Sequence, residues 1–312
     1  MSEVDPPASG IKPITKAVIP AAGWGTRMLP AAKAVPKELL PVLDKPTIQY
    51  VVEEAAAAGA GDVLLISSPA KRAVERHFQP NPELEQRLAG GKAALLASIA
   101  ELMRQTRVAA VDQLEQRGLG DAVRHARAFV GGDAFLCMLG DTIFSGATRA
   151  PARQLVDAHR ALGTSVIGIE QVPAEKVERY GIVGGTEVRP GVLRLDTIVE
   201  KPPLADAPSR FAVAARYVFT PAIFDCIEQT RPGKGGEIQL TDAIKLLLSR
   251  EPVHAVLLDS ARHDIGSPIE WLKTNLIFAA RDEKLAAQLA PLVRELFGVV
   301  GGGGDRTGAA IR

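Results

Sequence analysis

The sequence predicts an α/β protein with a doubly wound, mixed but mainly parallel sheet and a small antiparallel layer inserted in its second half. Apolar strand-like runs alternate with amphipathic helical segments through the first half of the chain. Short strand-like runs dominate the middle, and helices return towards the end. The 312 residues, of which 46% are hydrophobic, suffice for a full core.

The expected elements follow in chain order after a flexible arm at residues 1–15. Apolar runs bounded by turn residues predict strands at 16–22, 62–67, 107–111, 134–139, 165–169, 182–183, 192–199, 211–219 and 253–258. Helical spacing of apolar residues predicts helices at 47–58, 81–106 with a break at Gly90-Gly91, 120–129, 151–162, 221–229, 241–249 and 268–298. The Gly-rich tail at 299–312 is expected to be disordered.

Composition excludes several classes of protein. Lys and Arg together number 37 against 36 Asp and Glu, and this balance argues against a nucleic-acid partner. No stretch has the apolar length needed to span a membrane, and the polar N-terminus lacks a secretory signal. Cys137 lies in an apolar run, so a core thiol is expected rather than a disulfide with Cys226. These features indicate a cytoplasmic protein.

The stretch PAAGWGTRMLP at 20–30 is the first candidate site, because it leaves the first strand through a bare turn. A dinucleotide fingerprint needs a third glycine where Met28 stands, and the Gly-Lys-Ser/Thr of a P-loop is absent. What remains is a Gly-x-Gly-Thr-Arg turn at the carboxyl end of a strand, where open α/β sheets bind ligands. Backbone N–H groups and Arg27 would suit phosphate. A tight turn with a surface arginine explains the pentapeptide equally well.

The next residues favour the phosphate interpretation. Lys33, Lys37 and Lys45 follow within a loop punctuated by four prolines. Proline stiffens such a loop and would direct the lysines. Together with Arg27 they predict a polyphosphate site.

At this point the sequence resembles a known family. AAGWGTRMLPAAKAVPKELLPVLDKPTIQYVVEEA is similar to the signature of bacterial UTP–glucose-1-phosphate uridylyltransferases, nucleotidyltransferases of Rossmann-like, GT-A-like fold. The resemblance extends from about residue 14 to about 285. It implies one nucleotidyltransferase domain at 16–298, with a nucleotide half at about 16–145, a sugar-binding half at about 146–266 and C-terminal helices at about 267–298.

The resemblance implies a nucleotide site in the first half. Lys37 would reach the triphosphate, and Gln113 and Gly118 would read the uracil edge, for which an amide offers both a donor and an acceptor. Taken alone, Gln113 is more often a surface residue. The turn itself would bind nucleotide through Ala21, Ala22, Gly23, Gly25, Thr26 and Arg27.

Two aspartates are implied as Mg²⁺ ligands. Asp141 and Asp264 each follow an apolar strand, and Mg²⁺ prefers one or two carboxylates plus phosphate oxygens. On the residues alone, a turn or helix cap explains Asp141 as well. The chain departs from the family at Gly140, where uridylyl enzymes usually carry proline and thymidylyl relatives resemble this sequence. It also has Asp121 where the family often has histidine.

The sugar side is implied by later motifs. Tyr180 and Gly181 match the family's Tyr-Gly segment, and Glu200 and Lys201 match the Glu-Lys-Pro motif that holds sugar hydroxyls and sugar phosphate. By itself Glu-Lys-Pro is a common strand end. GGEIQLTD at 235–242 would shape the sugar pocket, and Thr241 or Asp242 could cap the following helix. His263 has no implied role beyond a structural one.

The implied reaction joins UTP and glucose 1-phosphate to give UDP-glucose and pyrophosphate, with Arg27, Lys37, Lys201 and Asp141 as the catalytic residues and Mg²⁺ as cofactor. A homodimer or homotetramer is expected from the family. A glucose-1-phosphate thymidylyltransferase using dTTP is the nearest alternative, supported by Gly140. A catalytically silent sugar-nucleotide-binding regulatory subunit is the alternative of another class, disfavoured because all these charged residues are present. The preference for glucose over galactose stays open.

Overall fold

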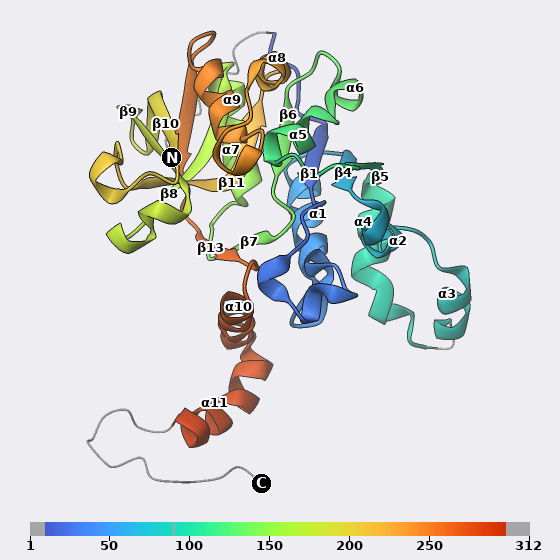
Figure 1. Ribbon diagram of the computed structural model, residues 1–312. Coiled ribbons are helices and arrows are strands. Elements are labelled where there is room, and N and C mark those ends of the chain that lie inside the picture. The colour runs from blue at the N-terminus through green and yellow to red at the C-terminus, as the bar shows by residue number, and fades with distance from the viewer. Residues whose placement is uncertain (1–9, 90, 298–312) are drawn as a thin grey trace, which may run out of the picture.

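The computed structural model describes residues 10–89 and 91–297, and its centre is a nine-stranded sheet in the order β5-β4-β1-β6-β11-β8-β12-β10-β9 (Figure 1). Two small antiparallel sheets pair β2 with β3 and β7 with β13. The strands are β1 (Lys16–Pro20), β2 (Pro41–Val42), β3 (Lys45–Pro46), β4 (Asp62–Ser67), β5 (Arg107–Asp112), β6 (Phe135–Met138), β7 (Thr142–Ser145), β8 (Ser165–Gln171), β9 (Gly181–Arg189), β10 (Val192–Glu200), β11 (Phe211–Phe219), β12 (Val253–Leu257) and β13 (Ala261–Asp264).

The first half of the sheet is parallel. β1 lies between β4 and β6, with Val18 opposite both Leu64 and Cys137. These strands are continuous apolar runs because helices cover both faces of the sheet. Parallel strands end at the same edge, so the turn after β1 and the loop after β6 are neighbours. This edge is where the site forms.

The antiparallel strands of the second half continue the same sheet. β11 runs antiparallel to β6 and β8, and β9 pairs with β10 and also with the start of β11. The expected antiparallel layer is therefore part of the central sheet, and its last strand, β9, returns to pair with β11. The α/β mixed sheet predicted from the sequence is confirmed.

A bulge interrupts β11 at the middle of the molecule. Val213 lies opposite Ile169, but Tyr217 lies opposite Ile167, so β11 carries extra residues against β8. Ala215 within the bulge has φ 58°, a conformation that L-residues rarely adopt. Its carbonyl accepts from the backbone N–H of Leu139 (3.1 Å). The bulge thereby joins β11 to the loop that follows β6.

Helices bury apolar residues against both faces of the sheet, as a doubly wound fold requires. α1, α4 and α7 pack on one face, and α5, α8 and α9 pack on the other. The helices are α1 (Thr47–Ala57), α2 (Arg72–Arg76), α3 (Pro82–Leu88), α4 (Ala97–Gln105), α5 (Leu119–Arg124), α6 (Arg127–Val130), α7 (Pro151–Leu162), α8 (Ala222–Gln229), α9 (Leu240–Leu247), α10 (Pro268–Arg281) and α11 (Glu283–Phe297). In Figure 1, α10 and α11 lead away from the body.

Several boundaries differ from the sequence prediction. The expected helix at 268–298 is two helices, and β7 and β13 were not predicted, because a four-residue strand such as ARHD has little pattern of its own. The expected arm packs in part, since Ile14 is buried. Residues 1–9 and the tail at 299–312 lie outside the described residues. No helix in the described part of the chain is long and apolar enough to cross a membrane.

Candidate active site

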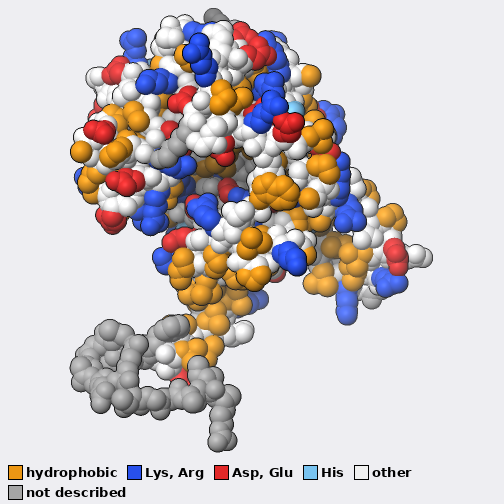
Figure 2. All heavy atoms as spheres, viewed as in Figure 1, with side chains coloured by type: hydrophobic (Ala, Val, Ile, Leu, Met, Phe, Trp, Pro, Cys, Tyr) orange, Lys and Arg blue, Asp and Glu red, His pale blue; other side chains and the backbone are white. Residues whose placement is uncertain are grey.

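Two adjoining cavities open at the carboxyl edge of the parallel strands. The larger, of about 1000 Å³, lies between the parallel and antiparallel halves, and Figure 2 shows a hollow with acidic and basic side chains around it. The smaller, of about 380 Å³, lies between the turn after β1 and the segment 113–119. Lys37 and Asp141 line both cavities. These two side chains therefore stand where the cavities meet.

The turn after β1 forms one wall of the smaller cavity. Ala21, Ala22 and Gly23 line it, and the N–H of Ala21 donates to the Ile66 carbonyl (2.8 Å). Gly25 has φ 65°, and a Cβ there would lie 3.3 Å from the Lys37 side chain. Glycine thus permits the turn to pack on the lysine stem.

A buried ion pair supports this turn from below. The Lys71 ammonium donates to both Glu38 oxygens (2.9 and 2.8 Å) and to the Ala21 carbonyl (2.7 Å). Glu38 is 1% exposed and directly follows Lys37. The pair therefore fixes the turn and the lysine segment relative to each other.

Lys37 and Asp141 form an ion pair at the junction of the cavities. The ammonium nitrogen of Lys37 lies 2.5 Å from Oδ2 of Asp141. Burial acts to lower the pKa of Lys37, but the negative charges of Asp141 and Glu38 outweigh it, so this pKa is raised. Burial likewise acts to raise the pKa of Asp141, but Lys37 outweighs it, and the pKa is lowered. Both side chains stay charged at neutral pH.

Asp264 is brought to Asp141 by the small sheet that the sequence did not predict. In the β7–β13 pairing Asp264 lies opposite Thr142, and the N–H of Ile265 donates to the Asp141 carbonyl (2.9 Å). Burial and then the charge of Asp141 raise the pKa of Asp264. A cation between the two carboxylates would relieve this repulsion. Two carboxylates that line one cavity fit the donor set of Mg²⁺.

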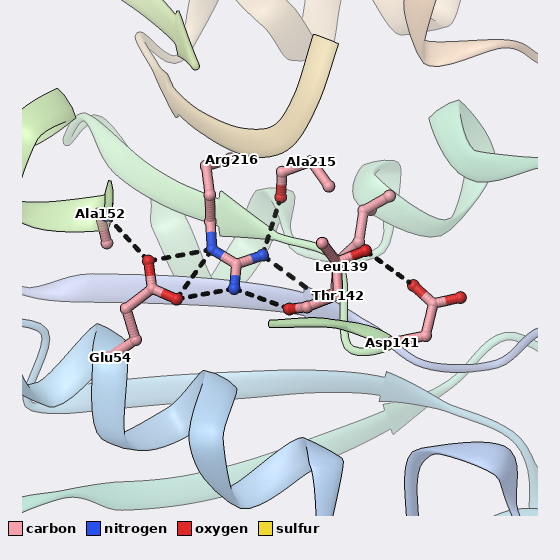
Figure 3. A network of polar contacts seen from close by, with 7 residues as sticks. All are labelled: Glu54, Leu139, Asp141, Thr142, Ala152, Ala215 and Arg216. Carbon is pink, nitrogen blue, oxygen red and sulfur yellow. Dashed lines mark hydrogen bonds and ion pairs between the residues drawn. The ribbon is translucent and has the colours of Figure 1, made fainter. Parts of the chain in front are cut away.

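A buried arginine holds the loop that carries Asp141 (Figure 3). Arg216 is 0% exposed, and its guanidinium pairs with both oxygens of Glu54 on α1. It also donates to the Thr142 carbonyl (2.8 Å) and, at 3.5 Å, to the Leu139 carbonyl. The Arg216 guanidinium thus fixes the backbone on both sides of Asp141.

The larger cavity carries polar groups from the antiparallel half. Glu200 accepts from the Thr241 hydroxyl (2.7 Å), and Gly181 leaves room for both, since a Cβ there would lie 3.3 Å from each oxygen. The Lys201 ammonium lies 3.1 Å from Oε1 of Glu200, and Lys201 has φ 47°. Thr241 therefore holds Glu200 and does not cap α9, whose N-cap is Gln239.

Arg262 is a cavity residue that the sequence did not single out. Its guanidinium lies 4.0 Å from the centroid of the Tyr180 ring and pairs with Glu170. It also donates to the Val213 carbonyl (3.2 Å), next to the β11 bulge. The sequence could have indicated Arg262 through its position two residues before the predicted metal ligand Asp264, because alternate residues of a strand face the same side.

Gln113 and Gly118 meet in the smaller cavity. The Gln113 amide nitrogen donates to the Gly118 carbonyl (3.3 Å). Gly118 has φ 104°, and a Cβ there would lie 2.8 Å from the Ile238 carbonyl oxygen, so only glycine fits. Gln116, which the sequence did not single out, donates to the Ala22 carbonyl (2.7 Å) and joins this segment to the turn.

Some expected residues lie elsewhere. Lys33 is exposed, and Lys45 pairs with Glu53 (2.7 Å), so the expected cluster of three lysines is wrong, and Lys37 alone of the three lines the cavities. Gly25 and Thr26 line neither cavity, whereas Arg27 lines the larger one. Cys137 is buried and free, as predicted, and Cys226 is buried and free as well.

Comparison with known proteins gives consistent matches. Residues 16–280 match the profile described as nucleotidyl transferase. The chain is 44% identical over 287 residues to the UTP–glucose-1-phosphate uridylyltransferase of Bacillus subtilis, covering 92% of this chain and 98% of that protein. The same enzyme of Staphylococcus haemolyticus is also 44% identical over 287 residues, with 92% and 99% covered.

Solved structures agree with the sequence matches. A UTP-bound UGPase from Acinetobacter baumannii superposes with a TM-score of 0.83 at 36% identity, covering 91% of this chain and 99% of that one. A UDP-glucose pyrophosphorylase complexed with UDP-glucose gives a TM-score of 0.80 at 34% identity, covering 86% and 99%.

Proposed function

The chain belongs to the nucleotidyl transferase family, and on this premise we propose that it transfers the uridylyl group of UTP to glucose 1-phosphate. The products are UDP-glucose and pyrophosphate. The observation that carries the proposal is the pair of cavities that meet at Lys37 and Asp141. A nucleotide in the smaller cavity and a sugar phosphate in the larger would bring their phosphates together there.

The reaction needs positioning and charge neutralisation rather than a general base. A phosphate oxygen of glucose 1-phosphate attacks the α-phosphorus of UTP, the bond to the β-phosphate oxygen breaks, and pyrophosphate leaves with that electron pair. The nucleophile is already an anion, so the obstacle is repulsion between two anions. Arg27 and Lys37 would hold the departing phosphates, and Lys201 would orient the attacking phosphate.

Asp141 and Asp264 would hold Mg²⁺, which would supply positive charge to offset the negative charge of the phosphates. Within the described residues no cluster of three or more His, Cys, Asp or Glu side chains could enclose a metal. Two carboxylates suit Mg²⁺, because this ion keeps waters and substrate oxygens as its other ligands. Lys37 pairs with Asp141 in this structure, so the same two side chains would be available to phosphates and to a cation.

The remaining expected residues divide between the two substrates. Gln113 and Gly118 would read the uracil edge beside the backbone of Ala21, Ala22 and Gly23. On the sugar side, Glu200 would accept hydrogen bonds from glucose hydroxyls, with Tyr180 and Gly181 shaping the pocket. Thr241 supports this assignment because it orients the Glu200 carboxylate.

Gly140 favours a thymidylyltransferase as the second candidate, but the structure gives this glycine another reason. A Cβ on Gly140 would lie 3.1 Å from Cδ1 of Ile48 and 3.2 Å from the Pro20 carbonyl oxygen. Close packing on β1 and α1 therefore accounts for the glycine.

The test is pyrophosphate release with glucose 1-phosphate and Mg²⁺, offering UTP and dTTP in parallel at equal concentration. We expect a strong preference for UTP. A preference for dTTP would support the second candidate. Absence of turnover with either nucleotide and with other sugar phosphates would favour the silent binding subunit.

We further propose that the protein is a cytoplasmic homodimer or homotetramer. Exposed apolar side chains along α10 and α11 support an assembly surface, since monomeric proteins rarely leave such a continuous face in water. The near-balance of acidic and basic residues supports small-molecule substrates rather than nucleic acid.

A further inference from the structure

A buried carboxylate stands directly behind the proposed base-reading glutamine. Asp121 is 1% exposed, and its Oδ2 accepts from the amide nitrogen of Gln113 at 2.8 Å. Its Oδ1 accepts from the Arg124 guanidinium at 2.7 Å, and the His125 ring nitrogen lies 3.7 Å from Oδ2. Both oxygens of this carboxylate are therefore engaged.

These contacts leave the Gln113 amide one orientation. An ionised carboxylate and a carbonyl only accept hydrogen bonds, so both Asp121 and the Gly118 carbonyl demand the NH₂ group of the amide. The Gln113 backbone is fixed as well, because its N–H donates to the Ser67 carbonyl (2.9 Å). Among the described residues, Oε1 of Gln113 has no hydrogen-bond partner, and the side chain lines the smaller cavity.

We propose that Asp121 is a specificity-determining positioning residue, which locks the Gln113 amide so that only an acceptor oxygen faces the base. This inference rests on the proposed function for the identity of the base. Uracil presents N3–H, a donor that Oε1 can accept. Cytosine presents an unprotonated N3, whose lone pair would face Oε1 and be repelled. Thymine has the same N3–H as uracil, so Asp121 selects against cytidine nucleotides and not against dTTP.

Asp121→Asn tests the proposal, because Arg124 dictates how the new amide turns. The guanidinium only donates, so the asparagine oxygen would face Arg124 and its NH₂ group would face Gln113. Gln113 would then turn its own oxygen towards the asparagine NH₂ and its own NH₂ towards the base, which suits cytosine, at the cost of its longer hydrogen bond to the Gly118 carbonyl (3.3 Å). We expect the ratio of kcat/KM for UTP to that for CTP to fall about tenfold, because the uracil N3–H loses its acceptor and the cytosine N3 gains a donor.

A double variant tests whether the lost preference for UTP can be restored. In Asp121→Asn combined with Arg124→Met, no donor holds the asparagine oxygen, so the asparagine can turn that oxygen back to Gln113. We expect part of the UTP preference to return. Asp225→Asn is the matched control, since Asp225 also pairs with an arginine (2.8 Å to Arg127) but lies on exposed surface.

The measurements are pyrophosphate release with UTP or CTP and glucose 1-phosphate, and calorimetric titration of each nucleotide alone. Equal losses for UTP and CTP in Asp121→Asn would overturn the inference and leave Asp121 a structural residue. An unchanged ratio in the binding titrations would overturn it as well. If no variant turns over either nucleotide but the binding ratio shifts as stated, the proposed function fails and the role of Asp121 stands.

Discussion

At the scale of single residues, the site places two carboxylates where their charges oppose each other. Asp141 is compensated by Lys37, whereas burial and then the charge of Asp141 raise the pKa of Asp264. A carboxyl whose pKa is higher in the folded state destabilises the fold once it ionises. This part of the stability is therefore lost as pH rises from the unfolded pKa through the folded pKa.

Asp264→Asn should separate the functional role of this residue from its cost to stability. Turnover should fall at least about a hundredfold, because a proposed ligand of the activating cation is lost. The unfolding temperature in metal-free buffer at pH 7 should stay equal or rise, because the amide carries no charge. Steady-state kinetics and calorimetric unfolding measure the two effects.

Asp206→Asn, on an exposed turn, serves as the control and should change neither quantity. A clear drop in the unfolding temperature of Asp264→Asn would contradict the argument. It would show that Asp264 stabilises the apo fold rather than straining it.

At the scale of elements, the loop after β6 depends on α1 and β11 through the Arg216–Glu54 pair (Figure 3). Glu54 also accepts from the N–H of Ala152, at the start of α7 (2.9 Å). One ion pair thus joins two helices, a bulged strand and the loop that carries Asp141. Removing one partner of such a buried pair usually costs about 3–5 kcal/mol, because the other charge is left uncompensated.

Arg216→Met should lower the free energy of unfolding by about that amount and also reduce turnover, because the carbonyls on either side of Asp141 lose their donor. Combining it with Glu54→Leu should recover part of the stability by removing the orphaned carboxylate. Turnover should not recover, because the loop still lacks its donor. Denaturant unfolding and kinetics of the two variants check both statements.

Equal stability of the single and double variants would contradict this account. The pair would then contribute packing rather than charge compensation. A matched surface pair, Arg127 with Asp225, should lose less than about 1 kcal/mol when broken.

At the scale of the whole molecule, the C-terminal helices lead away from the body (Figure 1), and Figure 2 shows hydrophobic side chains at their surface. Ile269, Leu272 and Leu276 recur at helical spacing on α10 and are 55%, 49% and 46% exposed. Leu292 and Leu296 continue the exposed apolar surface on α11. A second copy of the chain is the occupant that the proposed homo-oligomer supplies.

Leu276→Glu should therefore reduce the mass of the assembly, measured by sedimentation at micromolar concentration, because a charge would be buried in the interface. Leu204→Glu, which replaces a leucine that is similarly exposed (49%) but lies in the turn Leu204–Asp206 away from α10 and α11, is the control and should leave the mass nearly unchanged. A wild-type chain that sediments as a monomer would contradict the proposed assembly.

Much of the fold could be read from local pattern. Strands such as Asp62–Ser67 and Phe211–Phe219 and the helix Pro151–Leu162 were predicted to the residue, because long apolar periodicity identifies an element without tertiary information. The two-strand sheet of β7 and β13 was not predicted. Its strands have four residues each and exist because they pair with each other.

The sequence by itself determined the chemistry that this protein can offer: a glycine turn ending in Arg27, strand-end carboxylates and the Glu200-Lys201 pair, all in an ordered set of motifs. The tertiary structure alone decided which of these groups meet. It paired Lys37 with Asp141 and left Lys33 and Lys45 outside the cavities. It also brought Arg216 to the loop that carries Asp141, and Asp121 to the amide of Gln113. The physical reason is that residue type and spacing fix local conformation, whereas pairing across 104 positions, as between Lys37 and Asp141, depends on how strands and helices pack.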